Sequence, residues 1–581
     1  MPKYEEEAKL THSSDEFDLD TIFASDCIFS IPYFQREYIW SKTQLKQLRT
    51  DLLELVDEEE DITFLGAIIL YSRQVPAGRS KTYEVVDGQQ RLTTITLFFL
   101  CLVQQFCNLE QYEEAAQLFE RYVFLGKSRK ELSNLKLHPC KQDRLQFNSI
   151  VESLLTDEDL FNELGKPEIL YLPGTGNTQG NITTQFIEIK KFLEEEVEEG
   201  GYQRLDDIYQ ALLKKLTIVQ IILKDPYACP RIFERLNYRG QKVSIGDLVR
   251  NEIFSKVVNI DVVKLDQIYH KTWEPFYKKF GGAKAFEGFF FPFGLIKKSS
   301  LKKSEVFNYL RGAWNKTSNP EKIISDLKVY QDAYLFLLGK ITDIELSKKV
   351  RKIILKLVHA KVPSSTFPFL MQVMHSCQSG KLDEAATLQI FSVIDSFLTR
   401  RAVVGYEPTG LHAVFKGLFE ECGKRPTKET VIANIKKHKT VPWPGNEEFA
   451  RAIKERSIYT SGIASYLIRE YDMSLGKDVP SDKPEIEHIL PQRLTPEWKV
   501  DFSQDQHNKL KDTWANLIPV SSPLNKHVRQ KKFEIKQQTY KTDSMYATPR
   551  HVAQTYKTWN PTSISKRAAE LQKWSLERWP Y

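Results

Sequence analysis

The stretch that decides the fold of the first part of the chain is YEVVDGQQRLTT, residues 83–94. It reads as a short strand and then a helix, with Gly88 at the tight turn between them and an apolar helical pattern over residues 93–106. The unpaired N–H groups at the start of a helix attract anions, and the guanidinium of Arg91 matches phosphate oxygens. The members of the phosphate cradle that this stretch predicts are Gly88, Gln89, Gln90 and Arg91. An ordinary capped helix with a surface arginine is the alternative.

Apolar runs further along the chain extend this prediction. Residues 64–71 (FLGAIILY) and 216–223 (LTIVQIIL) are rich in β-branched side chains and predict strands. Helical patterns dominate residues 249–437, and the Pro-rich stretch 441–445 (VPWPG) predicts a linker. The three expected domains are residues 1–250, 251–440 and 446–581.

The composition excludes several classes of protein. The chain has 581 residues, of which 41% are hydrophobic and 27% charged, as in ordinary globular proteins and unlike disordered or fibrous chains. Its longest apolar run, residues 97–103, is far short of the ~18 residues that a membrane span needs. The N-terminus is acidic and has no apolar core of a secretion signal, and the seven cysteines are dispersed without a CxxC pair. We therefore expect a cytoplasmic protein with no membrane partner.

Two more motifs accompany the first one. They are IPYFQREYIW, residues 31–40, and IFERLNYRGQKVSIGDLVRN, residues 232–251. In the first, Arg36 lies between aromatic residues that we mostly expect in the core. In the second, Arg239 lies in a turn before a helix, where it either reaches a bound nucleotide or remains a loop arginine in water.

These three motifs, in this order and at these separations, resemble the family of restriction and phage-defence proteins with a ParB/sulfiredoxin-like nucleotidase domain, whose signature is DGQQR. The resemblance covers residues 1–250 and implies an α/β domain that binds and hydrolyses a nucleoside triphosphate (GTP, ATP or another). It implies catalytic roles for Asp87 and Arg91. The nucleotide-binding residues that it implies are Arg36, Asp87, Gly88, Gln89, Gln90, Arg91 and Arg239.

The second informative stretch is residues 486–536, which contains the pair Glu487 and His488 near its start. Hydrolysis of a phosphodiester needs a divalent cation and a general base for the attacking water. Mg²⁺, or Mn²⁺ in its place, takes oxygen ligands, so Glu487 and Asn525 are candidate metal ligands. Histidine has an ordinary pKa of ~6.5, so His488 is the candidate base. A Glu-His pair is a weak signal by itself, and a purely structural role is the alternative.

The spacing of the polar residues in this stretch fits a ββα-metal finger, because Asn516 follows His488 by 28 residues and Asn525 comes nine later. The segment resembles the HNH nuclease domain that is often fused to the DGQQR domain. The whole architecture resembles GmrSD-type and SspE-type modification-dependent restriction endonucleases. This resemblance implies that Glu487 and Asn525 hold the metal, that His488 is the base, and that Asn516 is the catalytic residue that orders the loop. Gln530 stands where the family has a second Asn, which leaves the metal ligand set open.

Basic charge gathers at the C-terminal end. The whole chain has a net charge of +6, but residues 511–581 hold 13 Lys and Arg against 5 Asp and Glu. Such a surface binds phosphates without reading sequence, although a solvated charged helix is the alternative. The candidate DNA-binding residues are Lys526, Arg529, Lys531, Lys532 and Lys536. Upstream, Arg400 and Arg401 either contact DNA or cap the C-terminal end of a helix, and we expect the cap.

The sequence therefore predicts an α+β protein with a ParB/sulfiredoxin-like α/β domain, a helical middle region and a C-terminal ββα-metal (HNH) domain. The predicted function is a nucleotide-regulated, modification-dependent DNA endonuclease of prokaryotic anti-phage defence. Its predicted partners are double-stranded DNA, modified or phage-derived, and a nucleoside triphosphate. A cutter of both strands with one nuclease domain per chain would favour a homodimer. Two alternatives are a non-catalytic ParB-like DNA-binding regulator with a decayed HNH module, and an RNA-targeting nuclease.

Overall fold

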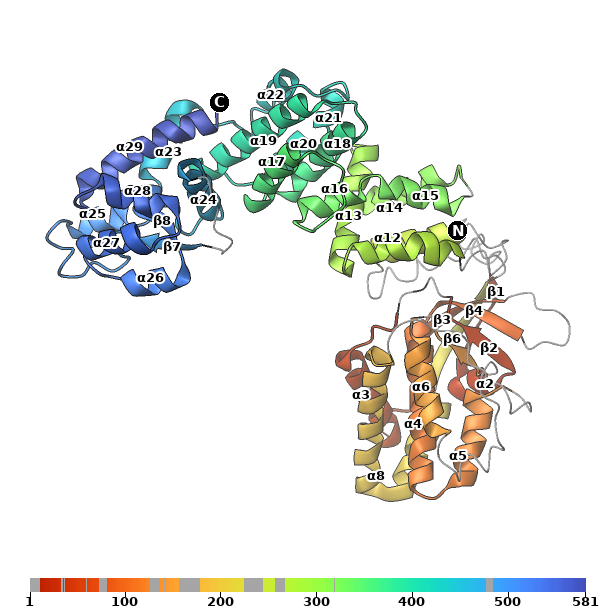
Figure 1. Ribbon diagram of the computed structural model, residues 1–581. Coiled ribbons are helices and arrows are strands. Elements are labelled where there is room, and N and C mark those ends of the chain that lie inside the picture. Colours follow the sequence, from red (N-terminus) through yellow and green to blue (C-terminus); the bar gives the residue numbers. More distant parts are fainter. Residues whose placement is uncertain are drawn as a thin grey trace. The chain divides into compact units, whose positions relative to one another are not determined.

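The chain divides into two compact units, which are coloured along the sequence in the computed structural model of Figure 1. The first unit comprises Met1–Pro275 and Arg311–Ile323, and the second comprises Phe276–Leu310 and Ile324–Tyr581. The residues that the structure describes are 11–32, 35, 37–58, 60–72, 81–125, 135–140, 142–155, 178–223, 244–255, 267–317, 319–476 and 484–581.

The first unit is built on a six-stranded mixed sheet with the strand order β1-β6-β3-β4-β2-β5. Its strands are β1 (Thr11–Asp18), β2 (Cys27–Ser30), β3 (Thr63–Ser72), β4 (Lys81–Asp87), β5 (Leu137–His138) and β6 (Leu216–Leu223). The pairs β2–β4, β2–β5 and β3–β6 are parallel, and β1–β6 and β3–β4 are antiparallel. The strands predicted from the three apolar runs are confirmed as β3, β4 and β6.

The helices of the first unit are α2 (Leu19–Ala24), α3 (Lys42–Val56), α4 (Gln89–Asn108), α5 (Tyr112–Leu118), η1 (Phe119–Val123), α6 (Arg144–Leu154), α8 (Asn181–Lys214), α10 (Ile245–Ser255) and η5 (Tyr269–Trp273). Figure 1 shows α3, α4, α5, α6 and α8 on one side of the sheet. Helix α4 is buried along most of its length and packs against α8, where the rings of Phe98 and Phe192 meet edge to face. The apolar side chains on every face of α4 explain this central position.

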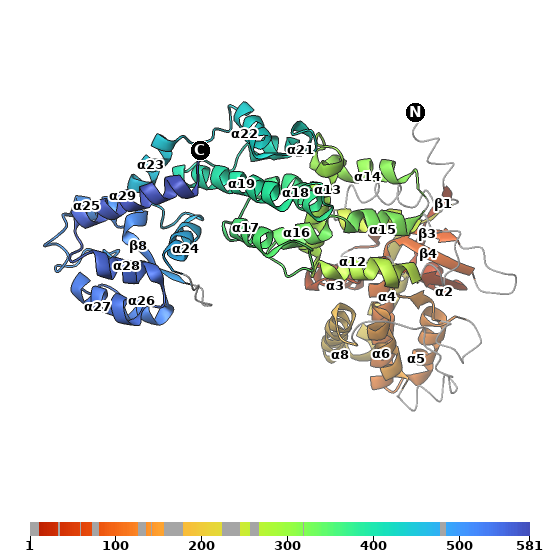
Figure 2. The ribbon, with the colours of Figure 1, turned by 45° about the horizontal axis from the view of Figure 1, so that its top comes forward.

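The second unit begins with helices that pack on one another. They are α13 (Ala283–Lys297), η6 (Lys303–Glu305), α16 (Gln331–Leu337), α17 (Lys348–His359), η7 (Ser364–Thr366), α18 (Phe367–Gln378), α19 (Glu384–Val404), α20 (Leu411–Phe415), α21 (Leu418–Glu421) and α22 (Lys428–Lys437). Figure 2 shows α16, α17, α18 and α19 side by side. The chain passes between the two units within α12 (Glu274–Lys279), α14 (Val306–Trp314) and α15 (Pro320–Lys328). None of the helices in the described part of the chain is long and apolar enough to cross a membrane.

The C-terminal part of the second unit surrounds a short antiparallel hairpin, β7 (Glu485–His488) with β8 (Leu517–Val520). Its helices are α23 (Asn446–Glu455), α24 (Ala464–Leu475), α25 (Gln504–Leu510), η8 (Trp514–Asn516), α26 (Ser522–Val528), α27 (Phe533–Asp543), α28 (Ala547–Thr555) and α29 (Pro561–Arg578). Four buried tryptophans belong to its core, namely Trp498, Trp514, Trp559 and Trp579. Helix α26 directly follows β8, so the hairpin and this helix form a ββα unit.

The stretch 441–445, predicted as a linker, is fixed to the helical region by a buried arginine of α19. Arg400 has no exposed surface and donates hydrogen bonds to the carbonyl oxygens of Trp579 (2.7 Å) and Pro444 (3.1 Å). A third bond goes to Asn446 Oδ1 (2.8 Å). Burial lowers the pKa of this guanidinium to about 10. The chain end, the joint and α19 are therefore held together at one point.

The neighbouring arginine of α19 also binds backbone carbonyl groups of the segment that follows the helix. Arg401 donates to the carbonyl oxygen of Pro442 (2.7 Å) and to that of Glu407 (3.0 Å). The helix itself ends at Gly405, whose positive φ of 97° is the usual left-handed helix ending. The expectation that Arg400 and Arg401 cap this helix is therefore wrong, because both side chains bind carbonyl groups of the segments that follow it.

We expect Arg400→Met to destabilise the second unit by about 1–3 kcal/mol, because the carbonyl groups of Trp579 and Pro444 would lose a charged donor. Thermal unfolding of the full chain followed by tryptophan fluorescence measures this change. Lys454→Met is the matched control, because Lys454 lies on the exposed face of α23. An unchanged melting temperature in Arg400→Met would show that the joint is not held by this residue.

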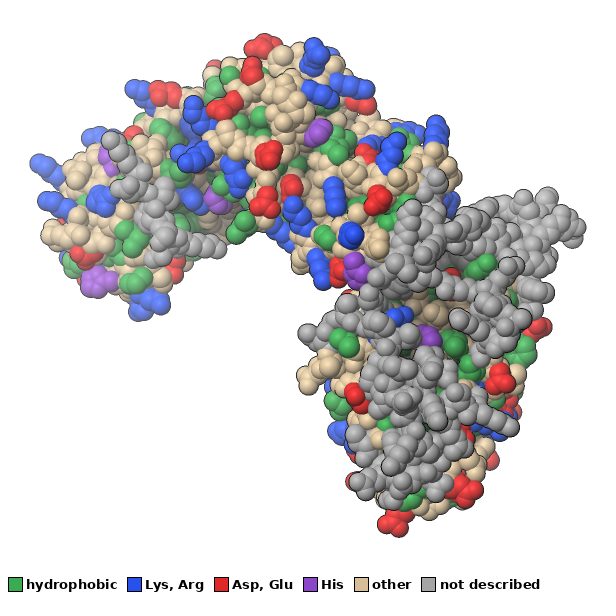
Figure 3. Space-filling model, turned by 45° about the vertical axis from the view of Figure 1, so that its right-hand side comes forward, with side chains coloured by type: hydrophobic (Ala, Val, Ile, Leu, Met, Phe, Trp, Pro, Cys, Tyr) green, Lys and Arg blue, Asp and Glu red, His purple; other side chains and the backbone are tan. Residues whose placement is uncertain are grey.

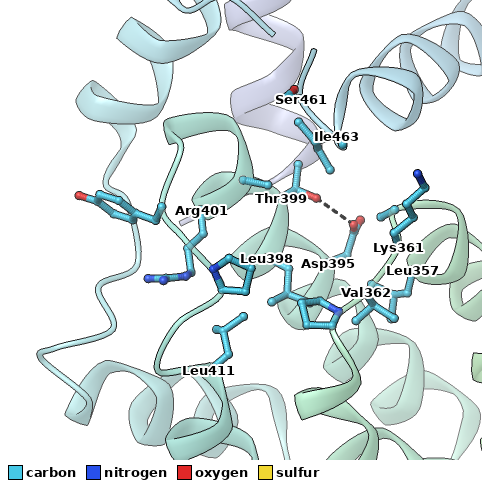
Figure 4. Close-up of a pocket in the computed structure, with 16 residues that line it drawn as sticks. Leu357, Lys361, Val362, Asp395, Leu398, Thr399, Arg401, Leu411, Ser461 and Ile463 are labelled. Atoms are coloured by element: carbon cyan, nitrogen blue, oxygen red, sulfur yellow. Dashed lines mark hydrogen bonds between the residues drawn. The ribbon is translucent and has the colours of Figure 1, made fainter. Parts of the chain in front are cut away.

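A cavity of about 270 Å³ lies between α17, α19 and the turn before α24 (Figure 4). Asp395 is part of its wall, and Figure 4 marks the hydrogen bond that Thr399 donates to it. The same carboxylate accepts bonds from the Tyr466 hydroxyl (2.7 Å) and the Trp579 indole (3.2 Å), and it is paired with Arg578 (2.9 Å). Its oxygens are thus occupied by the protein, and the buried charge ties α19 to α24 and α29.

Candidate functional site

The turn between β4 and α4 requires a glycine. Gly88 has a φ of 89°, in the left-handed region, and a Cβ added there would lie 2.6 Å from Cγ2 of Ile68. Because the strand ends at Asp87 and the helix begins at Gln89, the free N–H groups of the first helical turn come directly after this glycine. The local geometry is the one that the sequence predicts for an anion-binding turn.

Arg91 lies on the backbone of the neighbouring strand β3. Its Nη1 donates to the carbonyl oxygen of Ala67 (3.0 Å). A Cβ on Gly66 would come within 3.0 Å of its Nη2, so the guanidinium packs closely against this glycine. The register between β3 and β6 shifts at this place, between Phe64 and Ala67. The irregularity in β3 thus lies where the guanidinium of Arg91, from the first turn of α4, packs against the strand.

The two glutamines of the DGQQR motif have different surroundings. Gln90 is buried, and its Oε1 accepts bonds from the backbone N–H groups of Ile39 (2.8 Å) and Trp40 (3.2 Å). Its Nε2 donates to the carbonyl oxygen of Glu37 (3.3 Å). Gln89 is also buried, but its Oε1 has no hydrogen-bond partner among the described residues. Gln90 therefore anchors residues 37–40, and Gln89 keeps an open acceptor.

The anchored segment 37–40 forms part of a buried polar network. The backbone N–H of Tyr38 donates to Asp143 (2.7 Å), and its hydroxyl is hydrogen-bonded to that of Thr94 (2.6 Å). Asn181 donates to the carbonyl oxygen of Tyr38 (2.9 Å). Burial raises the pKa of Asp143 to about 6. Part of the IPYFQREYIW motif is thus pinned beside α4, whereas Arg36 and Arg239 lie outside the described residues and their predicted nucleotide contacts stay predictions.

His488 is the last residue of β7 and is almost completely buried. Its Nε2 lies 3.0 Å from Oδ1 of Asp512, and its ring stands edge to face on Tyr459, with 4.3 Å between the ring centroids. Burial lowers the pKa of His488, and the hydrogen bond from Asp512 acts in the opposite direction. The imidazole is therefore neutral near pH 7, which is the state that can accept a proton.

Asn516 ties together the two ends of the loop between the hairpin strands. Its Oδ1 accepts from the N–H of Leu490 (2.7 Å), and its Nδ2 donates to the carbonyl oxygens of Leu490 (2.8 Å) and Lys511 (2.7 Å). The indole of Trp559 donates to the same Oδ1 (3.1 Å). These bonds are those expected of a residue that orders the loop around His488.

Glu487 and Lys536 form a buried ion pair. Lys536 Nζ lies 2.6 Å from Glu487 Oε1 and donates to the carbonyl oxygen of His488 (2.8 Å), and the Tyr540 hydroxyl also donates to Oε1 (3.0 Å). Burial raises the pKa of Glu487 and lowers that of Lys536. The prediction that Lys536 binds DNA is wrong, because its side chain has no exposed surface. Oε1 of Glu487 is thus occupied by Lys536 and Tyr540, and the role of metal ligand stays a prediction for this residue.

Asn525, the second predicted metal ligand, contacts another carboxylate of β7. Its Nδ2 donates to Oε2 of Glu485 (2.7 Å), whose pKa is lowered by this bond. The described residues contain no group of three His, Cys, Asp or Glu side chains placed to hold a metal ion. Mg²⁺ usually keeps several waters and takes one or two protein oxygens. The exposed oxygens next to the hairpin that could serve it are those of Glu485 and Asn525.

The remaining predicted DNA-binding residues lie on α26 and in the turn after it. Lys526, Arg529 and Lys532 are exposed, and Lys531, which lies 3.2 Å from His527, is half-buried. Figure 3 shows Lys and Arg side chains over the visible face of the C-terminal part and also over the helical region. Charge by itself therefore does not single out α26.

Three residues of this site were missed from the sequence: Asp512, Tyr459 and Glu485. Asp512 and Glu485 lie within a few residues of Asn516 and Glu487, so an inspection of nearby carboxylates would have found them. Tyr459 lies 29 residues before His488 in another element, and no local pattern connects the two.

Comparison with protein families assigns both ends of the chain. The model for the GmrSD restriction endonuclease N-terminal domain matches residues 19–254, and the model for the C-terminal domain of GmrSD restriction endonucleases matches residues 443–574. No curated protein matches the chain. The two models together cover more than half of the sequence, and their description implies an endonuclease that acts on DNA. The chain belongs to the GmrSD restriction endonuclease family.

Proposed function

We propose that the chain is a modification-dependent DNA endonuclease of prokaryotic anti-phage defence, in which binding and hydrolysis of a nucleoside triphosphate regulate cleavage by an HNH-type site. The observation that carries the proposal is the position of His488 at the end of β7, in the ββα unit of a chain that belongs to a family of restriction endonucleases. With one nuclease site per chain, two copies would cut both strands.

In the proposed reaction, His488 takes a proton from the water that attacks the phosphodiester. Burial keeps the imidazole neutral near pH 7, and Asn516 holds the loop that carries it. A divalent cation, Mg²⁺ or Mn²⁺, would neutralise the charge on the phosphate and on the leaving oxygen. The exposed Lys526, Arg529 and Lys532 would attract the DNA backbone without reading its sequence.

The proposal places the nucleoside triphosphate at the start of α4. Three observations support it: the left-handed Gly88, the guanidinium of Arg91 seated against Gly66, and the buried Oε1 of Gln89 without a partner in the described part of the chain. Together they supply backbone donors, a fixed positive charge and a polar acceptor for a nucleotide. Gln90 supports this site indirectly, because its side chain holds the backbone of residues 37–40 in place.

Arg91→Ala is expected to weaken binding and turnover of the nucleoside triphosphate about 10- to 100-fold, because a charge-assisted hydrogen bond to phosphate contributes about 1.5–3 kcal/mol. Phosphate release, measured with each of the four nucleoside triphosphates and the full chain, reports this loss. Lys46→Ala is the control, because Lys46 is an exposed residue of α3 in the same unit. Unchanged turnover in a folded Arg91→Ala variant would refute the cradle.

Cleavage of phage DNA with and without Mg²⁺ tests the proposed function as a whole. Divalent-dependent cleavage of DNA supports it. Cleavage of RNA in preference to DNA would instead favour an RNA-targeting nuclease, and the absence of any cleavage would favour a DNA-binding regulator.

A further inference from the structure

We infer that Asp512 positions His488 for proton transfer, so that the two residues act as a pair. The inference rests on the proposed nuclease function and adds a residue to it. Asp512 does not touch the DNA in this account, and it acts through the imidazole. Of the residues that the structure describes, only Asp512 is hydrogen-bonded to that ring.

Two contacts fix the orientation of the ring. Nε2 of His488 lies 3.0 Å from Oδ1 of Asp512, and the ring stands at 69° to the ring of Tyr459, with 4.3 Å between the centroids. A carboxylate accepts hydrogen bonds, so the proton of the neutral imidazole lies on Nε2 and the lone pair lies on Nδ1. The pair therefore selects the tautomer as well as the direction of the base.

Asp512 is itself held in place from both sides along the chain. Its carbonyl oxygen accepts the N–H of Ile458 (2.9 Å), and Thr513, the next residue, forms a bridge with Ser457. Lys511, the residue before it, is bound by Asn516 (2.7 Å). The carboxylate thus stands on a fixed backbone, which an orienting residue requires.

Asn516 fixes the distance between the partners of the pair. It binds Leu490, two residues after His488, and Lys511, the residue before Asp512. The strand that ends at His488 and the segment that carries Asp512 are therefore joined by one buried amide. This arrangement explains why an asparagine without solvent exposure lies at the end of the loop, directly before β8.

The proposed step transfers a proton from water to His488 and breaks the phosphodiester bond. An O–H bond of the attacking water breaks, and its proton joins Nδ1 of His488. The water oxygen bonds to phosphorus, and the leaving sugar oxygen takes the electron pair of the bond that breaks. The imidazolium that forms is stabilised by the negative charge of Asp512, which keeps its hydrogen bond to Nε2 throughout.

A matched control exists in the same unit. His551 and Glu570 form another histidine–carboxylate pair, with 2.8 Å between Nε2 and Oε1. Glu570 also accepts the hydroxyl of Tyr471, and the pair lies on α28 and α29, outside the proposed site. A general effect of removing a carboxylate from a histidine would appear in both pairs.

The test compares cleavage of modified phage DNA by the full chain carrying Asp512→Ala, Asp512→Asn or Glu570→Gln, with kcat and KM measured separately. We expect Asp512→Ala to lower kcat about 10- to 100-fold with KM for DNA nearly unchanged, as for other residues that orient a functional histidine. Asp512→Asn keeps the shape but not the charge, so its kcat also falls. Glu570→Gln keeps its kcat.

The same assay under single-turnover conditions, with enzyme in excess, distinguishes failure of this inference from failure of the proposed function. In a His488→Ala background, Asp512→Ala is expected to cause no further loss, because it acts through the imidazole. Full kcat in both Asp512 variants, or losses that multiply with that of His488→Ala, would overturn the inference and leave the proposed function intact. Full activity of His488→Ala itself would overturn the proposed function.

Discussion

His488→Ala is expected to lower DNA cleavage about 100- to 10,000-fold, the usual contribution of a general base. In the proposed reaction the imidazole at the end of β7 accepts the proton of the attacking water, and an alanine supplies no proton acceptor there. Cleavage of phage DNA under single-turnover conditions measures the loss. Thermal unfolding of the same variant is expected to show that the unit remains folded.

The control for this substitution is His527→Ala. His527 lies on α26, is exposed and contacts Lys531, so it shares the neighbourhood of the site but not the pair with Asp512. We expect it to keep most of the activity. If both histidine variants cleave DNA as the unmodified chain does, His488 is a structural residue and the base lies elsewhere.

Lys536→Met is expected to destabilise the second unit by about 3–5 kcal/mol, because it leaves the carboxylate of Glu487 buried without its cation. Lys536 is completely buried and also binds the carbonyl oxygen of His488, so its loss disturbs both strand and helix. Chemical denaturation followed by tryptophan fluorescence measures the change. Lys532→Met, at an exposed position one turn before, is the control.

The double variant Glu487→Gln with Lys536→Met distinguishes a structural pair from a metal site. If the pair is structural, removing both charges restores part of the lost stability, since no isolated buried charge remains. If Glu487→Gln instead abolishes cleavage and leaves the unfolding free energy unchanged, Glu487 acts at the metal as the sequence suggested.

Local patterns predicted the first unit well. The turn at Gly88 and the start of α4 follow from a glycine with positive φ and from a continuous apolar helix, and both signals lie within one short stretch. Strand β6 could likewise be read from its β-branched residues. Strand β1 was not predicted, because its sequence THSSDEFD is polar and pairs only with β6, at the edge of the sheet.

The candidate site around His488 was predicted less completely, because its decisive contacts connect distant residues. Glu487 looks like a free carboxylate in the sequence, and only the folded chain brings Lys536 against it. Lys536 looks like one more lysine of a basic tail, although its position on the inner face of α27 buries it. Asp512 belongs to none of the motifs described above, and its inferred role as a positioning residue rests on a hydrogen bond to His488 across the loop. Charge and spacing suggest candidates, and packing decides which of them are open to a ligand.

The most direct measurement is cleavage of matched modified and unmodified phage DNA by the purified full chain, with each of the four nucleoside triphosphates, in Mg²⁺ or in EDTA. We expect cleavage of the modified DNA in Mg²⁺, none in EDTA, and a rate that depends on one of the nucleotides. Equal cleavage in EDTA, or no cleavage of either DNA under any of these conditions, would contradict the proposed function.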